Sequence, residues 1–431
     1  MRGVDSLRSD IHLTEGSSIS THARKAGAGG LLLAALLVFA LNLRGPFVAL
    51  APIVETIADG LGVSQETVGI LTGIPVLCFA LAAPLASLLI ARAGLERAVL
   101  VSLLVVFAGT VLRSAGGMET AIAGTILIGL GITVGNVAVP VIIARDFPER
   151  AGAVTGMYTA ALNVGSVVTT MLTAPLTAVV GWRWALVAWS SLMIVAAILW
   201  RRATAGRSSA PVVLAIQSDG RPVWRRPVVW CLTVAFGTQA FSYYSVTTWL
   251  PKILGDLEGL STEGAGGGAA LFQLAGIVGG VGVPLLVARK ASLRAVFAGM
   301  SALWLTLPVG LLVAPELWPV WALCAGISQG GNFTVLFTLI VHHARSQGDA
   351  RRMSAMIQTI GYAAAAVGPF ALGAVHTAAG GWTVPLLVVL GALGLMAASG
   401  LLAASVRPAR PSADAGGPAD DGVAADDGPA A

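Results

Sequence analysis

The stretch "GLGITVGN" (residues 129–136) has a near-copy, "AGISQGGN" (residues 325–332), 196 residues further along the chain. Two other motifs repeat at nearly the same offset. "VVGWRWAL" and "AAGGWTVPL" place Trp182 and Trp382 200 residues apart, and "LGVSQE" and "GLSTEG" recur 197 residues apart. Three markers within four residues of one offset indicate that the chain consists of a duplicated unit.

The composition places both copies in a membrane. The chain has 431 residues, of which 56% are hydrophobic and 11% charged, and its mean hydropathy is +0.83. A soluble domain carries about 25% charged residues. The net charge of +5 is therefore interpreted as a matter of topology and anionic lipid headgroups, not of nucleic acid. The three cysteines, all in apolar segments, are interpreted as packing residues and not as disulfide or metal ligands.

Twelve segments are long and apolar enough to cross a bilayer, which takes about 20 residues each. We predict spans at 30–53, 67–91, 98–114, 118–143, 152–178, 183–200, 228–251, 267–288, 293–313, 317–341, 354–378 and 382–405. The predicted organisation is a cytoplasmic N-terminal segment (1–29) without the features of a secretory signal, a six-helix half (30–200), a basic cytoplasmic linker (201–227), a second six-helix half (228–405) and a disordered cytoplasmic tail (406–431).

The distribution of basic residues predicts the orientation. With the N-terminus in the cytoplasm, 22 of the 26 lysines and arginines fall on the cytoplasmic side. Three are expected in external loops, namely Arg113, Arg183 and Lys252, and Arg44 lies within a span. Positive charge favours the cytoplasmic side of membrane proteins. We therefore expect a multi-pass protein of the plasma membrane with both termini in the cytoplasm.

Two six-helix repeats joined by a basic loop resemble the plan of the major facilitator transporters. The stretch "NLRGPFVALAP" (42–52) is similar to the first span of the cyanate/2-nitroimidazole transporter family, and the resemblance covers nearly all of residues 30–405. Further similar stretches are "GILTGIPVLCFALAAPLA" (69–86), "GLERAVLVSLL" (94–104), "PLTAVVGWRWAL" (175–186), "TTWLPKIL" (247–254) and "MSAMIQTIGYAAAAVGPFALG" (353–373). The resemblance implies small solutes such as cyanate and nitroimidazoles. The facilitator loop motif, "ARAGLERA" (91–98), lacks its usual acidic residue before the glycine.

Arg44 lies deep in the first predicted span, inside "VFALNLRGPFVAL" (38–50). It is about 21 Å along a helix from Gly30 and about 16 Å from Glu55, so its side chain cannot readily reach either membrane surface. A charge at this depth costs about 2.5–3.5 kcal/mol on insertion scales. All 21 acidic residues fall in loops, at span ends or in tails, which predicts no buried carboxylate partner. Two interpretations stay open: Arg44 binds an anionic or polar solute, or it caps carbonyls freed where Gly45-Pro46 breaks the helix. Asn42, about 200° around the helix from Arg44, is expected to bond to a neighbouring helix.

Polar side chains recur at helical spacing in other spans, and they serve either as solute ligands or as contacts between helices. Gln239 and Tyr243 share one face, as do Gln358 and Tyr362. The predicted substrate-binding set is Arg44, Asn136, Tyr158, Asn163, Gln239, Tyr243, Asn332, Gln358 and Tyr362. His376, near the outer end of its span, is the histidine considered for proton coupling.

The sequence contains no HExxH motif, no P-loop and no nucleophile–base constellation, which argues against an enzyme and predicts no cofactor and no metal. The first hypothesis is a secondary active or facilitative transporter of a small anionic or polar solute (a cyanate-like anion, a nitroimidazole or a small carboxylate), working as a monomer by alternating access. The alternatives are an efflux carrier for drugs or metabolites and a membrane sensor that keeps the fold without transporting.

Overall fold

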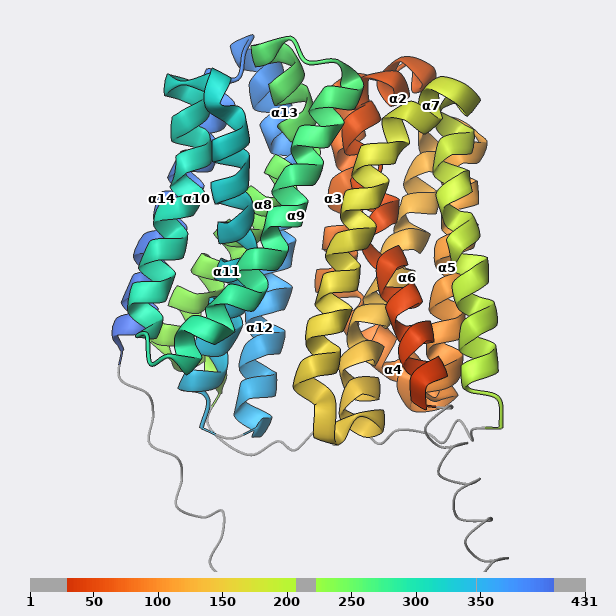
Figure 1. Cartoon of the computed structure of the whole chain (residues 1–431), viewed down its shortest axis with the longest axis vertical. Helices are drawn as coiled ribbons and strands as arrows, with labels where there is room; N and C mark the ends of the chain where they lie inside the picture. The colour runs from red at the N-terminus through yellow and green to blue at the C-terminus, as the bar shows by residue number, and fades with distance from the viewer. Residues whose placement is uncertain (1–28, 207–221, 346, 407–431) are drawn as a thin grey trace, which may run out of the picture.

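The computed structural model describes residues 29–206, 222–345 and 347–406. The predicted N-terminal segment, except for its last residue, most of the linker, and nearly all of the predicted tail lie outside the described residues. The part of the chain that is described consists of α-helices and short 3-10 turns, without a strand. Figure 1 shows two bundles of long helices standing side by side, the N-terminal one in red to yellow and the C-terminal one in green to blue.

The N-terminal bundle begins with a helix over residues 29–48 and continues through η1 (Ala51–Ile53), α2 (Val54–Leu61), α3 (Gln65–Leu81), α4 (Ala83–Ala93), α5 (Leu95–Ala115), α6 (Met118–Asp146), η2 (Pro148–Arg150) and α7 (Ala151–Ala203). Helices α3 and α4 form one broken span, bent by 61°. Helix α7 contains two spans, because the chain reverses at Gly181, whose φ of +79° lies in the left-handed region that glycine tolerates. The bundle therefore has six spans.

The C-terminal bundle follows the same plan. It contains η3 (Val223–Arg225), α8 (Pro227–Glu258), α9 (Thr262–Ala288), α10 (Leu293–Val313), η4 (Pro315–Leu317), α11 (Trp318–His343), α12 (Gln347–Ala366), α13 (Gly368–Ala379) and α14 (Thr383–Ser405). Helices α12 and α13 together make one interrupted span. The predicted fold, twelve transmembrane helices in two six-helix halves, is confirmed.

The two ends of the bundles differ. We call the end where the helix over residues 29–48 begins, α7 ends, α8 begins and α14 ends the linker side (bottom of Figure 1). The opposite end, which carries α2, the start of α3 and the end of α13, is the latch side. Many apolar side chains such as Leu85, Val278 and Leu402 are exposed along the helices, as expected for surfaces that face lipid.

The halves pack closely between the middle of the membrane and the latch side. Helix α3 packs against α12 and α13, and α7 packs against α9. A Cβ at Gly73 would overlap the carbonyl oxygen of Ala366, and one at Gly69 would lie 3.0 Å from that of Pro369. Glycine is needed at both positions because the neighbours are backbone atoms at the α12–α13 break, which cannot rotate away.

Candidate functional site

Arg44 joins the two halves through neutral groups. Its Nη1 donates a hydrogen bond to Oδ1 of Asn163 at 3.2 Å and another to the hydroxyl of Tyr243 at 3.4 Å. Asn163 belongs to α7 in the N-terminal half and Tyr243 to α8 in the C-terminal half. In residues 29–206, 222–345 and 347–406, no carboxylate pairs with Arg44, and its Nε and Nη2 contact no protein acceptor. Arg44 as a whole residue is only partly buried, so part of its surface is not covered by protein atoms.

All four tyrosines of the chain gather around this charge. Tyr158, Tyr243, Tyr244 and Tyr362 all lie close enough to Arg44 to interact with it electrostatically. The Arg44 guanidinium lies 5.7 Å from the centroid of the Tyr243 ring, a cation–π distance. The Tyr243 and Tyr244 rings contact each other edge to face at 5.0 Å. The result is one charge inside an aromatic cage that both halves build.

A second layer supports Tyr243. Its hydroxyl donates to Oε1 of Gln273 at 3.3 Å, and Nε2 of Gln273 donates to the hydroxyl of Thr247 at 3.3 Å. The Tyr243 oxygen therefore accepts from Arg44 and donates to Gln273, which fixes its orientation. Helical spacing in the sequence does not indicate Gln273, which has no polar neighbour at that spacing in the glycine-rich α9, or Tyr244, which follows Tyr243 directly and so lies on another face of α8.

Gln239 and Asn332 are instead tied into the C-terminal half. Oε1 of Gln239 accepts a hydrogen bond from Trp304 at 2.8 Å, and its Nε2 donates to the carbonyl of Gln329 at 3.4 Å. Nδ2 of Asn332 donates to the hydroxyl of Ser328 at 3.1 Å. Both side chains are fully buried, and these bonds join α8, α10 and α11. For these two predicted site residues, the observed contacts are those of helix packing.

The remaining predicted residues border more open space. Tyr158 and Gln358 are partly buried, while Asn136 in the middle of α6 is exposed. Asn136 therefore differs from its repeat mate Asn332, which is fully buried.

Two expectations about the first helix and its neighbours are wrong. Arg113 was expected in an external loop, yet it lies in α5 with 2% of its surface exposed. Asn42 was expected to bond to another helix, yet its Nδ2 donates to the carbonyl of Val38, one turn earlier in the same helix, at 2.7 Å. Charge counting treats every residue near a span end as a loop residue, and this caused the error at Arg113.

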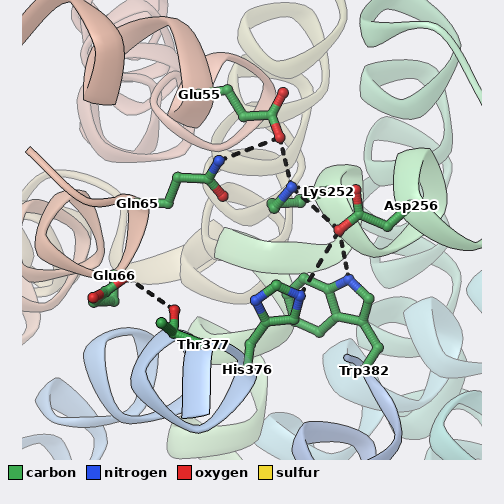
Figure 2. Close-up of polar contacts among 8 residues, drawn as sticks. All are labelled: Glu55, Gln65, Glu66, Lys252, Asp256, His376, Thr377 and Trp382. Atoms are coloured by element: carbon green, nitrogen blue, oxygen red, sulfur yellow. Dashed lines mark hydrogen bonds and ion pairs between the residues drawn. The ribbon is translucent and has the colours of Figure 1, made fainter. Parts of the chain in front are cut away.

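A polar cluster on the latch side connects the halves a second time (Figure 2). Lys252 in α8 pairs with Glu55 in α2 at 2.5 Å, and Thr377 in α13 donates to Glu66 in α3 at 3.0 Å. The cluster, which we call the latch, consists of Glu55, Gln65, Glu66, Lys252, Asp256, His376, Thr377 and Trp382. Near mid-membrane, Thr248 also donates to Thr72 across the halves, at 3.1 Å.

Lys252 is the centre of the latch. Its ammonium group contacts Glu55 and also Asp256, at 3.2 Å, while Asp256 accepts a hydrogen bond from Trp382 at 2.8 Å. Burial alone would lower the pKa of Lys252, which lies just past its predicted span, but the hydrogen bonds that it donates to Glu55 and Asp256 outweigh burial and raise the pKa. Glu55 and Lys252 are 197 residues apart, the repeat offset. Opposite charges at equivalent positions of the two repeats are the signal that was missed.

Comparisons with known proteins agree with this architecture. The model of the Major Facilitator Superfamily matches residues 30–369. The 2-nitroimidazole transporter of Escherichia coli is 33% identical over 83% of this chain and 91% of its own length. The uncharacterized transporter YycB of Bacillus subtilis is 31% identical over 85% of this chain and 91% of its own length. The cyanate transport protein CynX of Escherichia coli is 27% identical over 84% of this chain and 95% of its own.

Solved structures share the fold. A bacterial homologue of the human lysosomal transporter Spinster, in an inward-facing and unoccupied conformation, superposes with a TM-score of 0.72 at 15% identity, over 88% of this chain and 97% of that one. The D-xylose–proton symporter gives a TM-score of 0.68 at 15% identity, over 87% and 96%. These likenesses extend to the fold alone.

Proposed function

We propose that this chain, which belongs to the Major Facilitator Superfamily and is a transporter and not an enzyme, carries a small anionic or electron-rich polar solute bound at Arg44. The observation that carries the proposal is the set of partners of Arg44. A full charge lies deep in a span, between the two halves, and its contacts are an amide and a phenol. A buried charge without a counter-ion is costly. An electron-rich ligand would offset this cost, because it would interact with a guanidinium that no protein carboxylate neutralises.

The free donors of Arg44 suit such a ligand. Both of its protein contacts use Nη1, which leaves Nε and Nη2 for the solute. A guanidinium offers its donors as a planar fork that binds two acceptor atoms at once. A carboxylate, a nitro group or the ends of a small linear anion can each accept from this fork, whereas an apolar drug cannot.

The tyrosine cage adds a preference for flat solutes. The rings of Tyr243 and Tyr244 contact each other edge to face, as do those of Tyr244 and Tyr362, so aromatic rings and hydroxyl groups are gathered beside the Arg44 guanidinium. Flat π systems pack well on such surfaces. The names of two relatives, a 2-nitroimidazole transporter and a cyanate transport protein, fit this chemistry: one names a flat ring with a nitro group and the other a small anion.

The latch supports transport by alternating access, with the linker side in the cytoplasm. The hydrogen bonds between the halves lie at Arg44 and from there toward the latch side, among the residues described. In this arrangement the latch is the closed external gate. The excess of basic residues on the linker side supports the orientation. The solute enters or leaves when the latch opens and the halves separate on that side.

Counterflow in proteoliposomes tests the proposal. Vesicles loaded with unlabelled cyanate or 2-nitroimidazole should accumulate the corresponding labelled probe through the purified protein. Arg44→Gln should lose most exchange of the anion and less of the neutral ring, and Arg44→Lys, which keeps the charge and loses the fork, should retain part of both. Arg183→Gln is the matched control, because Arg183 is exposed and bonds the carbonyl of Gly116 far from the site.

Two outcomes would contradict the proposal. Binding of either probe without any exchange would make the protein a sensor. Anion exchange at the parental rate by a folded Arg44→Gln variant would remove Arg44 from the solute site.

A further inference from the structure

A second arginine, Arg113, is buried directly behind the helix that carries Arg44. It lies near the end of α5, with 2% of its surface exposed, and its Nη1 donates to the carbonyl oxygen of Pro46 at 2.5 Å. Its Nε is buried without a hydrogen-bond partner. None of the acidic residues in the described ranges pairs with it. Arg113 is therefore not part of an ion pair that simply holds two helices together.

The carbonyl that Arg113 contacts is left free by a break in the backbone. The helix over residues 29–48 loses regular bonding just past Arg44: the N–H of Leu50 bonds to the carbonyl of Phe47, at 3.4 Å, in a 3-10 turn. In a regular α-helix the N–H of Leu50 would bond to the carbonyl of Pro46, four residues back, so this carbonyl has no helical donor here. A buried polar group without a partner costs about 1–3 kcal/mol. Arg113 supplies the missing donor and so stabilises the break where it is.

Residues of the first helix around the break line a cavity of about 180 Å³, together with Thr110, Arg113 and Trp189. Four of them, at positions 42, 45, 46 and 49, are roughly 100–200° around the helix from Arg44, and the fifth, Leu41, is about 60° from it. The cavity therefore lies mainly on the side of this helix away from Arg44. The cavity leaves room for this segment to shift, and the bond from Arg113 is a polar contact at its wall that ties the segment to α5. A movement of the break would rotate or tilt the turn that carries Arg44.

From this geometry we propose that Arg113 is a positioning residue, which rests on the proposed function of Arg44: by bonding the Pro46 carbonyl it holds the helix break and so keeps the Arg44 guanidinium aimed into the solute site. Arg113 acts through Arg44 and does not touch the solute. Its positive charge suits the role, since a charged donor binds a lone carbonyl more strongly than a neutral one does.

The first test uses a double-mutant cycle in counterflow with labelled cyanate and 2-nitroimidazole. Arg113→Met keeps a long side chain but removes the donor, and should raise the KM for cyanate about five- to tenfold with little change in maximal rate. Arg113→Lys, which can still donate, should restore most of the affinity. In an Arg44→Gln background Arg113→Met should have no further effect on KM, because coupled residues are not additive. Additive effects, or a loss of folded yield with KM unchanged, would make Arg113 a purely structural residue and overturn the proposal.

The second test does not depend on any solute. In a background whose three cysteines are replaced, Arg44→Cys reports the orientation of position 44 through its rate of reaction with a small water-soluble thiol reagent. Arg113→Met should change that rate at least about threefold at temperatures where both proteins are folded. The matched control is Arg183→Met, since Arg183 also donates to a carbonyl, at 3.0 Å, but on the surface.

The two tests separate the two proposals. An unchanged reaction rate at position 44 overturns the role of Arg113 whether or not the protein transports either probe. A changed rate in a protein that exchanges neither cyanate nor 2-nitroimidazole supports the positioning role and places the failure in the choice of solute. The melting temperature of each variant, measured in detergent, shows whether it is folded.

Discussion

Replacing Gly73 by alanine should open the latch side of the protein. In the observed state a Cβ on Gly73 would overlap the carbonyl oxygen of Ala366, at the break between α12 and α13. Because the obstacle is backbone, it cannot move aside by changing a rotamer. Overpacking of this kind costs about 1–3 kcal/mol. The cost applies only while α3 and α12 are pressed together, so the ratio of closed to open latch should fall by about 5- to 150-fold.

The change in helix propensity does not interfere with this estimate. Alanine favours a helix over glycine by up to about 1 kcal/mol, but a rigid-body separation of the halves keeps α3 helical, so this gain cancels. The matched control is Gly280→Ala in α9, where a Cβ would have nothing within 4 Å. The control makes the same chemical change in the other half, at a position where the added methyl group would touch nothing.

Spin-label distances measure the outcome. A label pair at exposed Ser64 and Glu263 crosses the halves on the latch side, and a pair at exposed Arg97 and Arg294 crosses them on the linker side. Gly73→Ala should lengthen the first distance and shorten the second, and Gly280→Ala should leave both unchanged. Parental distance distributions for Gly73→Ala, in a protein that melts at the parental temperature, would refute the reasoning from this close contact.

Individual contacts and the expected orientation give the remaining predictions. Tyr243→Phe keeps the ring but removes the hydroxyl that links Arg44 to Gln273. Its affinity for cyanate, obtained from the thermal stabilisation that cyanate gives, should be about three- to tenfold lower than that of the parent protein. An undiminished stabilisation would contradict the network. Glu55 is 60% exposed, so its ion pair with Lys252 should contribute little. A double-mutant cycle with Glu55→Gln and Lys252→Gln, in which the latch-side label distances report the ratio of closed to open latch, should give a coupling of only about 0.2–1 kcal/mol. High salt should abolish this coupling. Since the pKa of Lys252 is raised above 10.5, that coupling should be constant from pH 6 to 9 and be lost only as the pH rises past the raised pKa; a loss near neutral pH would argue against this pair. Cysteines at positions 208 and 261 should react with an impermeant reagent from opposite sides of the membrane, and labelling from one side would overturn the orientation.

The sequence was most informative where the bilayer itself imposes the pattern. Long apolar runs and the significance of the depth of Arg44 follow from the cost of placing polar groups in hydrocarbon, while the repeat offset follows from the duplicated unit. The structure confirms the twelve-helix fold. The i,i+4 spacing of Tyr243 also pointed correctly to a residue that contacts Arg44. Helical spacing alone, however, cannot tell a cavity from a helix interface, and so it grouped Gln239 with Tyr243 although the two have different partners.

The residues that were missed depend on tertiary structure. Gln273 has no polar neighbour at helical spacing and enters the network only because α9 packs beside α8. Arg113 lies close enough to a helix end to be counted as a loop residue, and its burial follows from a free carbonyl on another helix. Glu55 and Lys252 sit at equivalent positions of the two repeats, but only the way the halves face each other brings them together.

The neutrality of the partners of Arg44 has a consequence for transport. A fixed carboxylate would stabilise the empty site, and an anionic solute would first have to displace it, so little binding energy would remain to favour one conformation over another. An amide from one half and a phenol from the other hold the guanidinium in place while leaving its charge unneutralised. A solute that binds Arg44 and the Tyr243 side of the cage contacts both halves at once. Its binding energy then favours states in which the halves are close around it. Occupancy of a central site can in this way drive the change from the state open on one side of the membrane to the state open on the other.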